Sequence, residues 1–183
     1  MRADARKNYE TLIKVARNHI SQQGVATSLD AIAKEAGVGA GTLYRHFPDR
    51  DHLIFAALNT QGEELREAAV TIRASTKEED QLEEWLIRVE KYFSSYHGLP
   101  ESLARALADG NDTPLAITCH EIIETTNIFL ADAQRLNIAR PEVTGQDLFD
   151  ATLMIAWLGA RGSEHNQGLE AVRNLCRNGY RVS

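Results

Sequence analysis

Apolar residues recur at intervals of three and four along almost the whole chain of 183 residues, and no stretch alternates apolar and polar residues as a half-buried strand does. This periodicity predicts an all-α protein. Glycines at positions 24 and 37 and a proline at position 48 mark helix ends, because these residues stop or break helices. We expect about nine helices, over residues 6–23, 29–36, 40–47, 50–74, 82–96, 101–108, 113–137, 146–160 and 167–180.

The helix lengths divide the chain into two parts. Three helices fall within the first 50 residues and six longer or later ones follow, in a chain long enough to bury a sizeable core. We therefore predict a head at residues 1–50 and a helical body at residues 51–183, and we expect the helix over residues 50–74 to link them.

Charge is distributed unevenly between these two parts. Residues 1–50 hold eight Lys or Arg against five Asp or Glu, whereas the rest holds 12 against 21, and the whole chain has a net charge of −6. This split favours a head that approaches phosphates. No apolar run reaches the roughly 20 residues that span a bilayer, and the N-terminus has no apolar signal segment. We expect a soluble, cytoplasmic protein with no membrane partner.

Cysteine and histidine content gives no sign of a cofactor. Cys119 and Cys176 lack paired metal-type spacing, which argues against a disulfide or zinc framework; buried thiols are the simpler interpretation, and redox sensing stays open. His120 and Glu124 lie one turn apart, but nothing supplies the further ligands that a metal needs. We expect no metal and no other cofactor.

The segment over residues 29–47 has the pattern of a helix-turn-helix, because two short helices flank a tight glycine-containing turn. On a helical projection of residues 40–47, Leu43 and Phe47 point to the head, whereas Gly41, Thr42 and Arg45 point away. The outward face is therefore small and carries one cation.

This face suits the DNA major groove, because glycine allows close approach and arginine can read guanine through two hydrogen bonds. Tyr44 and His46 could contact the flanking phosphates; alternatively, Tyr44 covers the head's core and His46 is a surface histidine without a DNA contact. Helix-start residues Thr27 or Ser28, and Arg50, are further phosphate candidates. The complete predicted DNA-binding set is Thr27, Ser28, Gly39, Ala40, Gly41, Thr42, Tyr44, Arg45, His46 and Arg50.

The segment TSLDAIAKEAGVGAGTLYRHFPDRDHL closely resembles the DNA-binding head of TetR-family transcriptional regulators, over residues 6–58. The most specific part is G-V-x-x-G-T-L-Y-x-H-F, followed three residues later by a cation. The sequence departs from the commonest pattern at Gly39-Ala40, where many members carry Ser-Lys, and at Arg50, where lysine is commoner. We therefore assign base contacts to Arg45 and Thr42.

The resemblance implies a homodimer that binds double-stranded DNA at a palindromic operator and represses transcription until a small-molecule effector releases it. A DNA-binding factor of the same fold without an effector, acting as an architectural or partner-controlled protein, is the alternative. No nucleophile with a base, phosphate-binding glycine loop or carboxylate pair occurs in a convincing context, so we do not expect an enzyme.

Residues beyond 58 offer only patterns, which suit a divergent ligand-binding and dimerisation domain. An aromatic set could line an effector pocket, although ordinary core is the alternative interpretation: Trp85, Tyr92, Tyr96, His120, Phe129 and Trp157. The last two helices combine small and apolar residues that permit close helix packing. By resemblance they would form a four-helix dimer interface, with Leu148, Ile155, Gly159, Leu169, Val172, Leu175 and Cys176.

Overall fold

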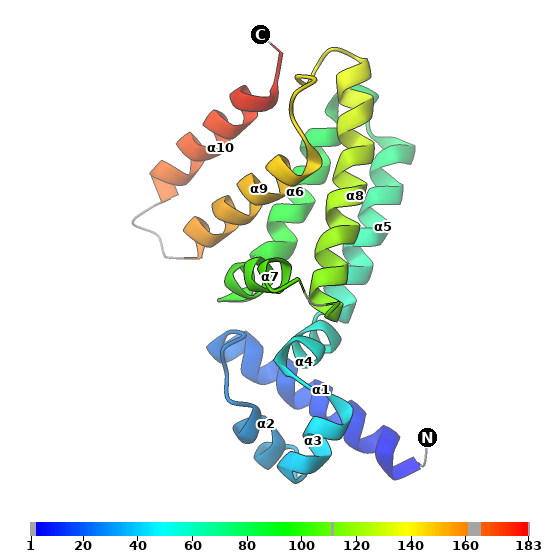
Figure 1. Cartoon of the computed structure of the whole chain (residues 1–183), viewed down its shortest axis with the longest axis vertical. Coiled ribbons are helices and arrows are strands. Elements are labelled where there is room, and N and C mark those ends of the chain that lie inside the picture. The colour runs from blue at the N-terminus through cyan, green and yellow to red at the C-terminus, as the bar shows by residue number, and fades with distance from the viewer. Residues whose placement is uncertain (1–2, 111, 161–165, 183) are drawn as a thin grey trace. The chain divides into compact units, whose positions relative to one another are not determined.

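The computed structural model describes residues 3–110, 112–160 and 166–182, and it confirms the all-α prediction (Figure 1). Over these residues there is no strand, and only an isolated antiparallel bridge joins Ala139 to Arg181. No described helix combines the length and apolar character needed to cross a bilayer. The elements are α1 (Ala3–Gln23), α2 (Leu29–Glu35), α3 (Ala40–His46), α4 (Arg50–Ala57), α5 (Asn59–Ser75), the 3-10 turn η1 (Glu78–Asp80), α6 (Gln81–Phe93), α7 (Leu99–Ala108), α8 (Pro114–Arg135), α9 (Gly145–Gly159) and α10 (Asn166–Tyr180).

The chain folds into two compact units. Unit 1 comprises Met1–Thr60 with Tyr96–Ile117, and unit 2 comprises Gln61–Ser95 with Thr118–Ser183. Unit 1 thus contains the predicted head together with α4 and α7. A domain boundary at residue 50 stays a prediction.

The single helix predicted over residues 50–74 is divided into α4 and α5 at Leu58. Leu58 is buried, and its amide donates to the carbonyls of Ile54 and Phe55, which closes α4. Asn59 and Thr60 follow at once, and such side chains compete for backbone hydrogen bonds and weaken a continuous helix. This division accounts for the ten α-helices of the described residues, where about nine were expected.

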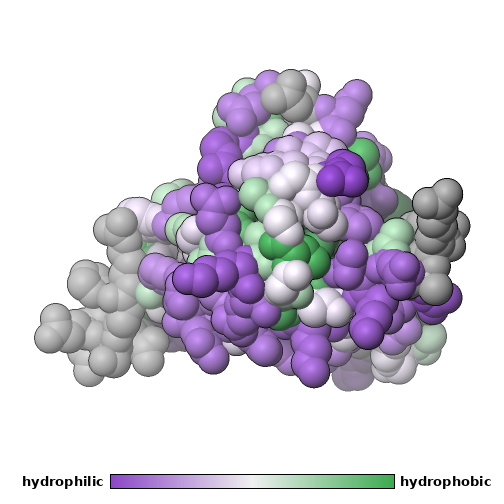
Figure 2. All heavy atoms as spheres, turned by 90° about the horizontal axis from the view of Figure 1, so that it is seen from below, coloured by the Kyte–Doolittle hydropathy of each residue, from purple (hydrophilic) through white to green (hydrophobic). Residues whose placement is uncertain are grey.

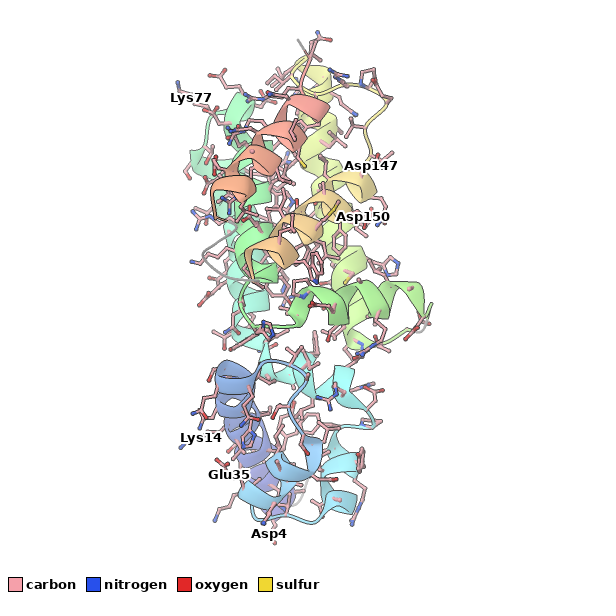
Figure 3. All side chains as sticks on the ribbon, turned by 90° about the vertical axis from the view of Figure 1, so that its left-hand side faces the viewer. Asp4, Lys14, Glu35, Lys77, Asp147 and Asp150 are labelled. Carbon is pink, nitrogen blue, oxygen red and sulfur yellow. The ribbon has the colours of Figure 1, made fainter. Side chains whose placement is uncertain are left out.

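Unit 1 is built on α1, which packs against α2 and α4, while α2 packs against α3. A buried His19 on α1 contacts Glu35 at the end of α2, with 2.8 Å between Nε2 and Oε2; Glu35 is marked in Figure 3. Apolar side chains fill the space between the helices, because each helix turns one apolar stripe inward. They include Leu12, Ala16, Ile20, Ile32, Leu43, Phe47, Leu53 and Ile54.

Unit 2 has an aromatic core in which α9 packs against both α6 and α10. Phe93 of α6 meets Phe149 of α9 edge to face, with ring centroids 5.1 Å apart, an arrangement that aromatic rings favour. At the start of α9, Thr144 and Asp147 form a reciprocal capping box; Asp147 is marked in Figure 3. Hydrogen bonds from the Thr144 side chain and amide lower the pKa of the Asp147 carboxyl.

Candidate nucleic-acid interface

The turn between α2 and α3 requires glycine at one position only. Gly37 has φ +68°, a left-handed conformation that side chains with a Cβ rarely adopt. Gly39, the N-cap of α3, has φ −71°, which any residue can adopt. Ser28 caps α2 by accepting a hydrogen bond from the Ala31 amide at 3.3 Å. Ser28 therefore caps α2 with its side chain, whereas α3 begins at Gly39 without a side-chain cap.

The inward side of α3 is packed as the projection predicted. Leu43 and Phe47 are buried, and the Phe47 ring stacks on Tyr9 of α1 with centroids 5.2 Å apart. The ring of His46 also lies against Tyr9, at 5.9 Å, and is half-buried. His46 therefore has a packing role inside unit 1, and its phosphate contact stays a prediction.

The outward side of α3 is exposed and small. Gly39, Ala40 and Gly41 are exposed, and a Cβ added at Gly39 would meet no atom within 4 Å. Arg45 lies back along the helix, where its Nε donates to the Gly41 carbonyl at 3.0 Å. Tyr44 is 47% exposed. The view from below shows weakly polar and hydrophobic residues near the centre of the visible face, bordered by hydrophilic ones (Figure 2).

The structure distinguishes the two candidate phosphate contacts at the start of α2. Thr27 is buried, and its hydroxyl is hydrogen-bonded to Gln23 and His19 at 3.2 Å each. Ser28 is exposed. Of the two alternatives, the geometry favours Ser28, because its hydroxyl lies at the surface.

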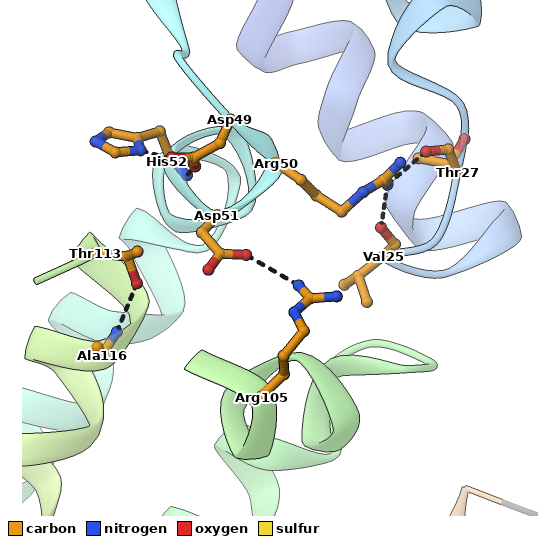
Figure 4. Close-up of polar contacts among 9 residues, drawn as sticks. All are labelled: Val25, Thr27, Asp49, Arg50, Asp51, His52, Arg105, Thr113 and Ala116. Carbon is orange, nitrogen blue, oxygen red and sulfur yellow. Dashed lines mark hydrogen bonds and ion pairs between the residues drawn. The ribbon is translucent and has the colours of Figure 1, made fainter. Parts of the chain in front are cut away.

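Arg50 is held inside unit 1. Its Nη1 donates to the carbonyl oxygens of Val25 and Thr27, at 2.7 and 2.6 Å (Figure 4). Sequence reasoning missed these contacts because a backbone carbonyl has no signature in the sequence. A phosphate contact by Arg50 stays a prediction.

The six aromatic pocket candidates differ in burial and in the unit to which they belong. Trp85 and Phe129 are buried and stack with centroids 5.4 Å apart, and the indole N–H donates to Thr126 at 2.9 Å. Tyr96 belongs to unit 1, unlike the other five residues. His120 is exposed and Trp157 half-buried.

Two small cavities in unit 2 nevertheless border members of this aromatic set. Trp85 borders one of about 110 Å³, with Arg66, Thr118 and Glu121, and Tyr92 borders another of about 120 Å³. Burial raises the pKa of the Tyr92 hydroxyl far above its usual value, and the nearby Cys119 thiol adds to the shift. The phenol therefore stays protonated at any ordinary pH.

The predicted dimer residues of α9 and α10 divide into an inner and an outer group. Leu148, Ile155 and Leu169 are buried within the chain. Leu175, in contrast, is 70% exposed, and Gly159 is exposed as well. Val172 and Cys176 are half-buried, and burial raises the pKa of the Cys176 thiol, which lowers its thiolate fraction. Within one chain α10 is also joined to α6 through ion pairs, among them Arg173–Glu90 and Arg177–Glu83.

Comparison with known proteins gives this geometry a family. Residues 12–57 match the family described as bacterial regulatory proteins, tetR family, and residues 77–182 match the C-terminal domain of SbtR-like transcriptional regulators. The chain belongs to the TetR family of transcriptional regulators. In TetR-family terms, α3 is the second helix of the helix-turn-helix.

Individual proteins to which the chain is similar agree with this assignment. A helix-turn-helix transcriptional regulator of Staphylococcus aureus is 43% identical over 56 residues, which is 30% of this chain and 30% of that protein. A TetR regulator from Streptomyces coelicolor is 27% identical with a TM-score of 0.61, covering 96% of this chain and 99% of that chain. One from Mycobacterium vanbaalenii is 28% identical with a TM-score of 0.51, covering 99% of each chain. The chain thus spans about 30% of the length of the curated relatives and nearly all of the solved ones.

Proposed function

We propose that this protein regulates transcription by binding a palindromic operator as a homodimer, with α3 of each copy in the major groove of one half-site. The observation that carries the proposal is the outward face of α3. Gly39 and Gly41 lack positive φ, and apart from the adjoining backbone no atom of the described residues lies closer than 4.0 Å to a Cβ built at either position. The fold does not require glycine there, so the small surface is explained by a close external partner. Selection of bound sequences from random DNA tests this: a two-fold symmetric sequence is expected, and its absence would contradict the proposal.

Arg45 is the side chain proposed to read bases from this face. Its Nε is held by the Gly41 carbonyl, which leaves both terminal nitrogens to face a partner. Two donors in a fixed fork match the acceptors of guanine, and such a pair discriminates by about 1–3 kcal/mol against the wrong base.

Arg45→Ala should therefore relax base preference at one position of each half-site. We expect the ratio of Kd for a single-base variant to Kd for the operator to fall about tenfold or more at that position. The same ratio should change little at the other positions of the half-site. Arg45→Lys is the matched control, because it keeps the charge but loses the fork. An unchanged preference profile in Arg45→Ala would remove Arg45 from the reading face.

Two-fold symmetry requires a dimer, because two heads must reach half-sites roughly 34 Å apart. The exposed apolar side chains Met154 of α9 and Leu175 of α10 are 57% and 70% exposed. Exposed apolar side chains on both α9 and α10 offer a surface that a second copy could cover.

Leu175→Glu should weaken this dimer, because it places a charge, and its symmetry mate, in a desolvated interface. We expect at least a tenfold increase in the dimer dissociation constant, about 1.4 kcal/mol, measured by analytical ultracentrifugation. Val70→Glu, at a 71% exposed position on α5, is the control and should leave the dimer intact. Equal dimerisation by both variants would exclude α10 from the interface.

We further infer that a small molecule binding in unit 2 releases the protein from its operator. The cavities beside Trp85 and Tyr92 support this, since they combine an aromatic wall with polar groups. Their volumes of about 110 and 120 Å³ are smaller than typical ligand sites, of about 300 Å³ or more, which suits the alternative of a regulator without an effector. A more open cavity of about 330 Å³, also in unit 2, reaches the size of a ligand site.

A thermal-shift screen with lipophilic cations, phenols and acyl compounds separates these two functions. A compound that raises Tm and also lowers operator affinity supports ligand-released repression. If no compound in a broad screen changes either quantity, the regulator without an effector is the better account. Repression itself is tested by transcription in vitro from a promoter that overlaps the selected operator.

A further inference from the structure

Arg50 makes a contact that its predicted role does not use. It is the first residue of α4, yet its guanidinium turns toward the loop between α1 and α2, where one nitrogen bridges the carbonyls of Val25 and Thr27 (Figure 4). Hydrogen bonds from a charged donor at such distances are roughly twice as strong as neutral ones. Arg50 is half-buried and forms no ion pair with any residue that the structure describes. The contacts that the structure gives the guanidinium are therefore with backbone oxygens, both through Nη1.

The loop that receives these bonds directly precedes the N-cap of α2. On its other side it is fixed to the turn before α7, because the Val25 amide donates to the His97 carbonyl at 2.9 Å. Gly24 has φ +80°, and a Cβ there would lie 2.5 Å from the same carbonyl oxygen, so the two segments are in close contact. Arg50 thus holds the two carbonyls that flank Ala26, immediately before Ser28.

The start of α4 is itself anchored. Asp51, the next residue, pairs with Arg105 of α7 at 3.1 Å, and the Asp51 side chain is only 14% exposed (Figure 4). Two neighbouring residues of α4 therefore bond in different directions: Arg50 to the loop before α2, and Asp51 to α7. These bonds connect the start of α4 to the loop before α2 and to α7.

We propose that Arg50 is a positioning residue for DNA binding: it fixes the start of α2, and through the α2–α3 packing it fixes α3, without contacting a phosphate. This rests on the DNA-binding function proposed above. Because the guanidinium is directed at carbonyls, it contributes to affinity through geometry and releases no counterion from DNA. A phosphate contact, in contrast, adds about 0.9 to the slope of log K against log salt.

Operator affinity of Arg50→Met across a salt titration distinguishes the two roles. We expect at least tenfold weaker binding with the salt slope of the parent protein. A slope that falls by about one unit would overturn the proposal, because it identifies a lost phosphate contact. Lys77→Met, which removes one charge from η1's N-cap in unit 2, controls for net charge and should change neither quantity appreciably.

Two further measurements separate positioning from general destabilisation. Arg50→Lys should restore most of the affinity, since an ammonium can also donate to both carbonyls. Hydrogen exchange in free Arg50→Met should rise at Ala31 and its neighbours in α2, but not in the middle of α1. Equal loss of protection throughout unit 1 would overturn the proposal. Exchange needs no DNA, so it tests the tether even if the parent protein prefers no DNA sequence, a result that would instead refute the proposed function.

Discussion

Gly41→Ala is expected to make the protein more stable and its operator complex much weaker. Gly41 is the second residue of α3, and alanine in a helix is more favourable than glycine by up to about 1 kcal/mol. A Cβ there would lie 4.0 Å from the nearest atom, Arg45 Nη2, so nothing in the fold is displaced. We expect Tm to rise by roughly 2–4 °C.

Operator affinity in the same variant should fall on the order of 100-fold, because a misfit at a contacted base pair costs about 1–3 kcal/mol and the dimer carries the change twice. Gly179→Ala is the matched control. Gly179 lies in α10, and a Cβ there meets no atom within 4 Å. The Gly179→Ala variant should therefore be more stable than the parent protein and bind DNA equally well. If Gly41→Ala bound the operator as tightly as the parent protein, α3 could not lie close to DNA at this residue.

Phe129→Ala is expected to cause the largest loss of stability. The ring is 1% exposed, stacks on Trp85 and lies 5.7 Å from the Arg73 guanidinium. Truncating a buried phenylalanine typically costs about 3–5 kcal/mol, since transfer and cavity terms add. We expect the midpoint of thermal unfolding to fall by about 10 °C or more.

This prediction decides between the two interpretations of the aromatic set. If Phe129 is ordinary core, the free protein loses this stability without any ligand present. Val70→Ala, at a 71% exposed position, is the control and should change the unfolding free energy by no more than about 0.5 kcal/mol. A loss below about 1 kcal/mol in Phe129→Ala would instead indicate that the ring lines an accessible cavity.

The sequence predicted the helices well because their apolar residues repeat at three and four, a signal that depends on one segment alone. Leu58 shows the limit of this signal. It is apolar and in register with the stripe of α4, so periodicity continues through the residue at which the helix ends. The break falls directly before Asn59 and Thr60, residue types that favour helix ends and that periodicity ignores.

Contacts between distant segments account for most of what the sequence did not predict. Arg50 bonds to the backbone carbonyls of residues 25 and 23 positions away, and Arg173 pairs with a glutamate 83 positions away. Neither contact leaves a local pattern in the sequence. The outward face of α3 could be predicted, because a seven-residue helix fixes the relative directions of Gly41 and Arg45. The sequence alone could not show that the fold does not need glycine at positions 39 and 41, because this depends on which atoms surround a Cβ there.

The central claim is that paired copies of α3 recognise a DNA sequence. The most direct measurement compares Kd for the selected operator with Kd for random duplex of equal length, at one stated salt concentration. We expect the operator to bind at least 1,000-fold more tightly, in the range of about 10³–10⁷ that sequence-specific regulators reach. Equal affinity for both duplexes, in a protein that is folded and dimeric, would contradict the account.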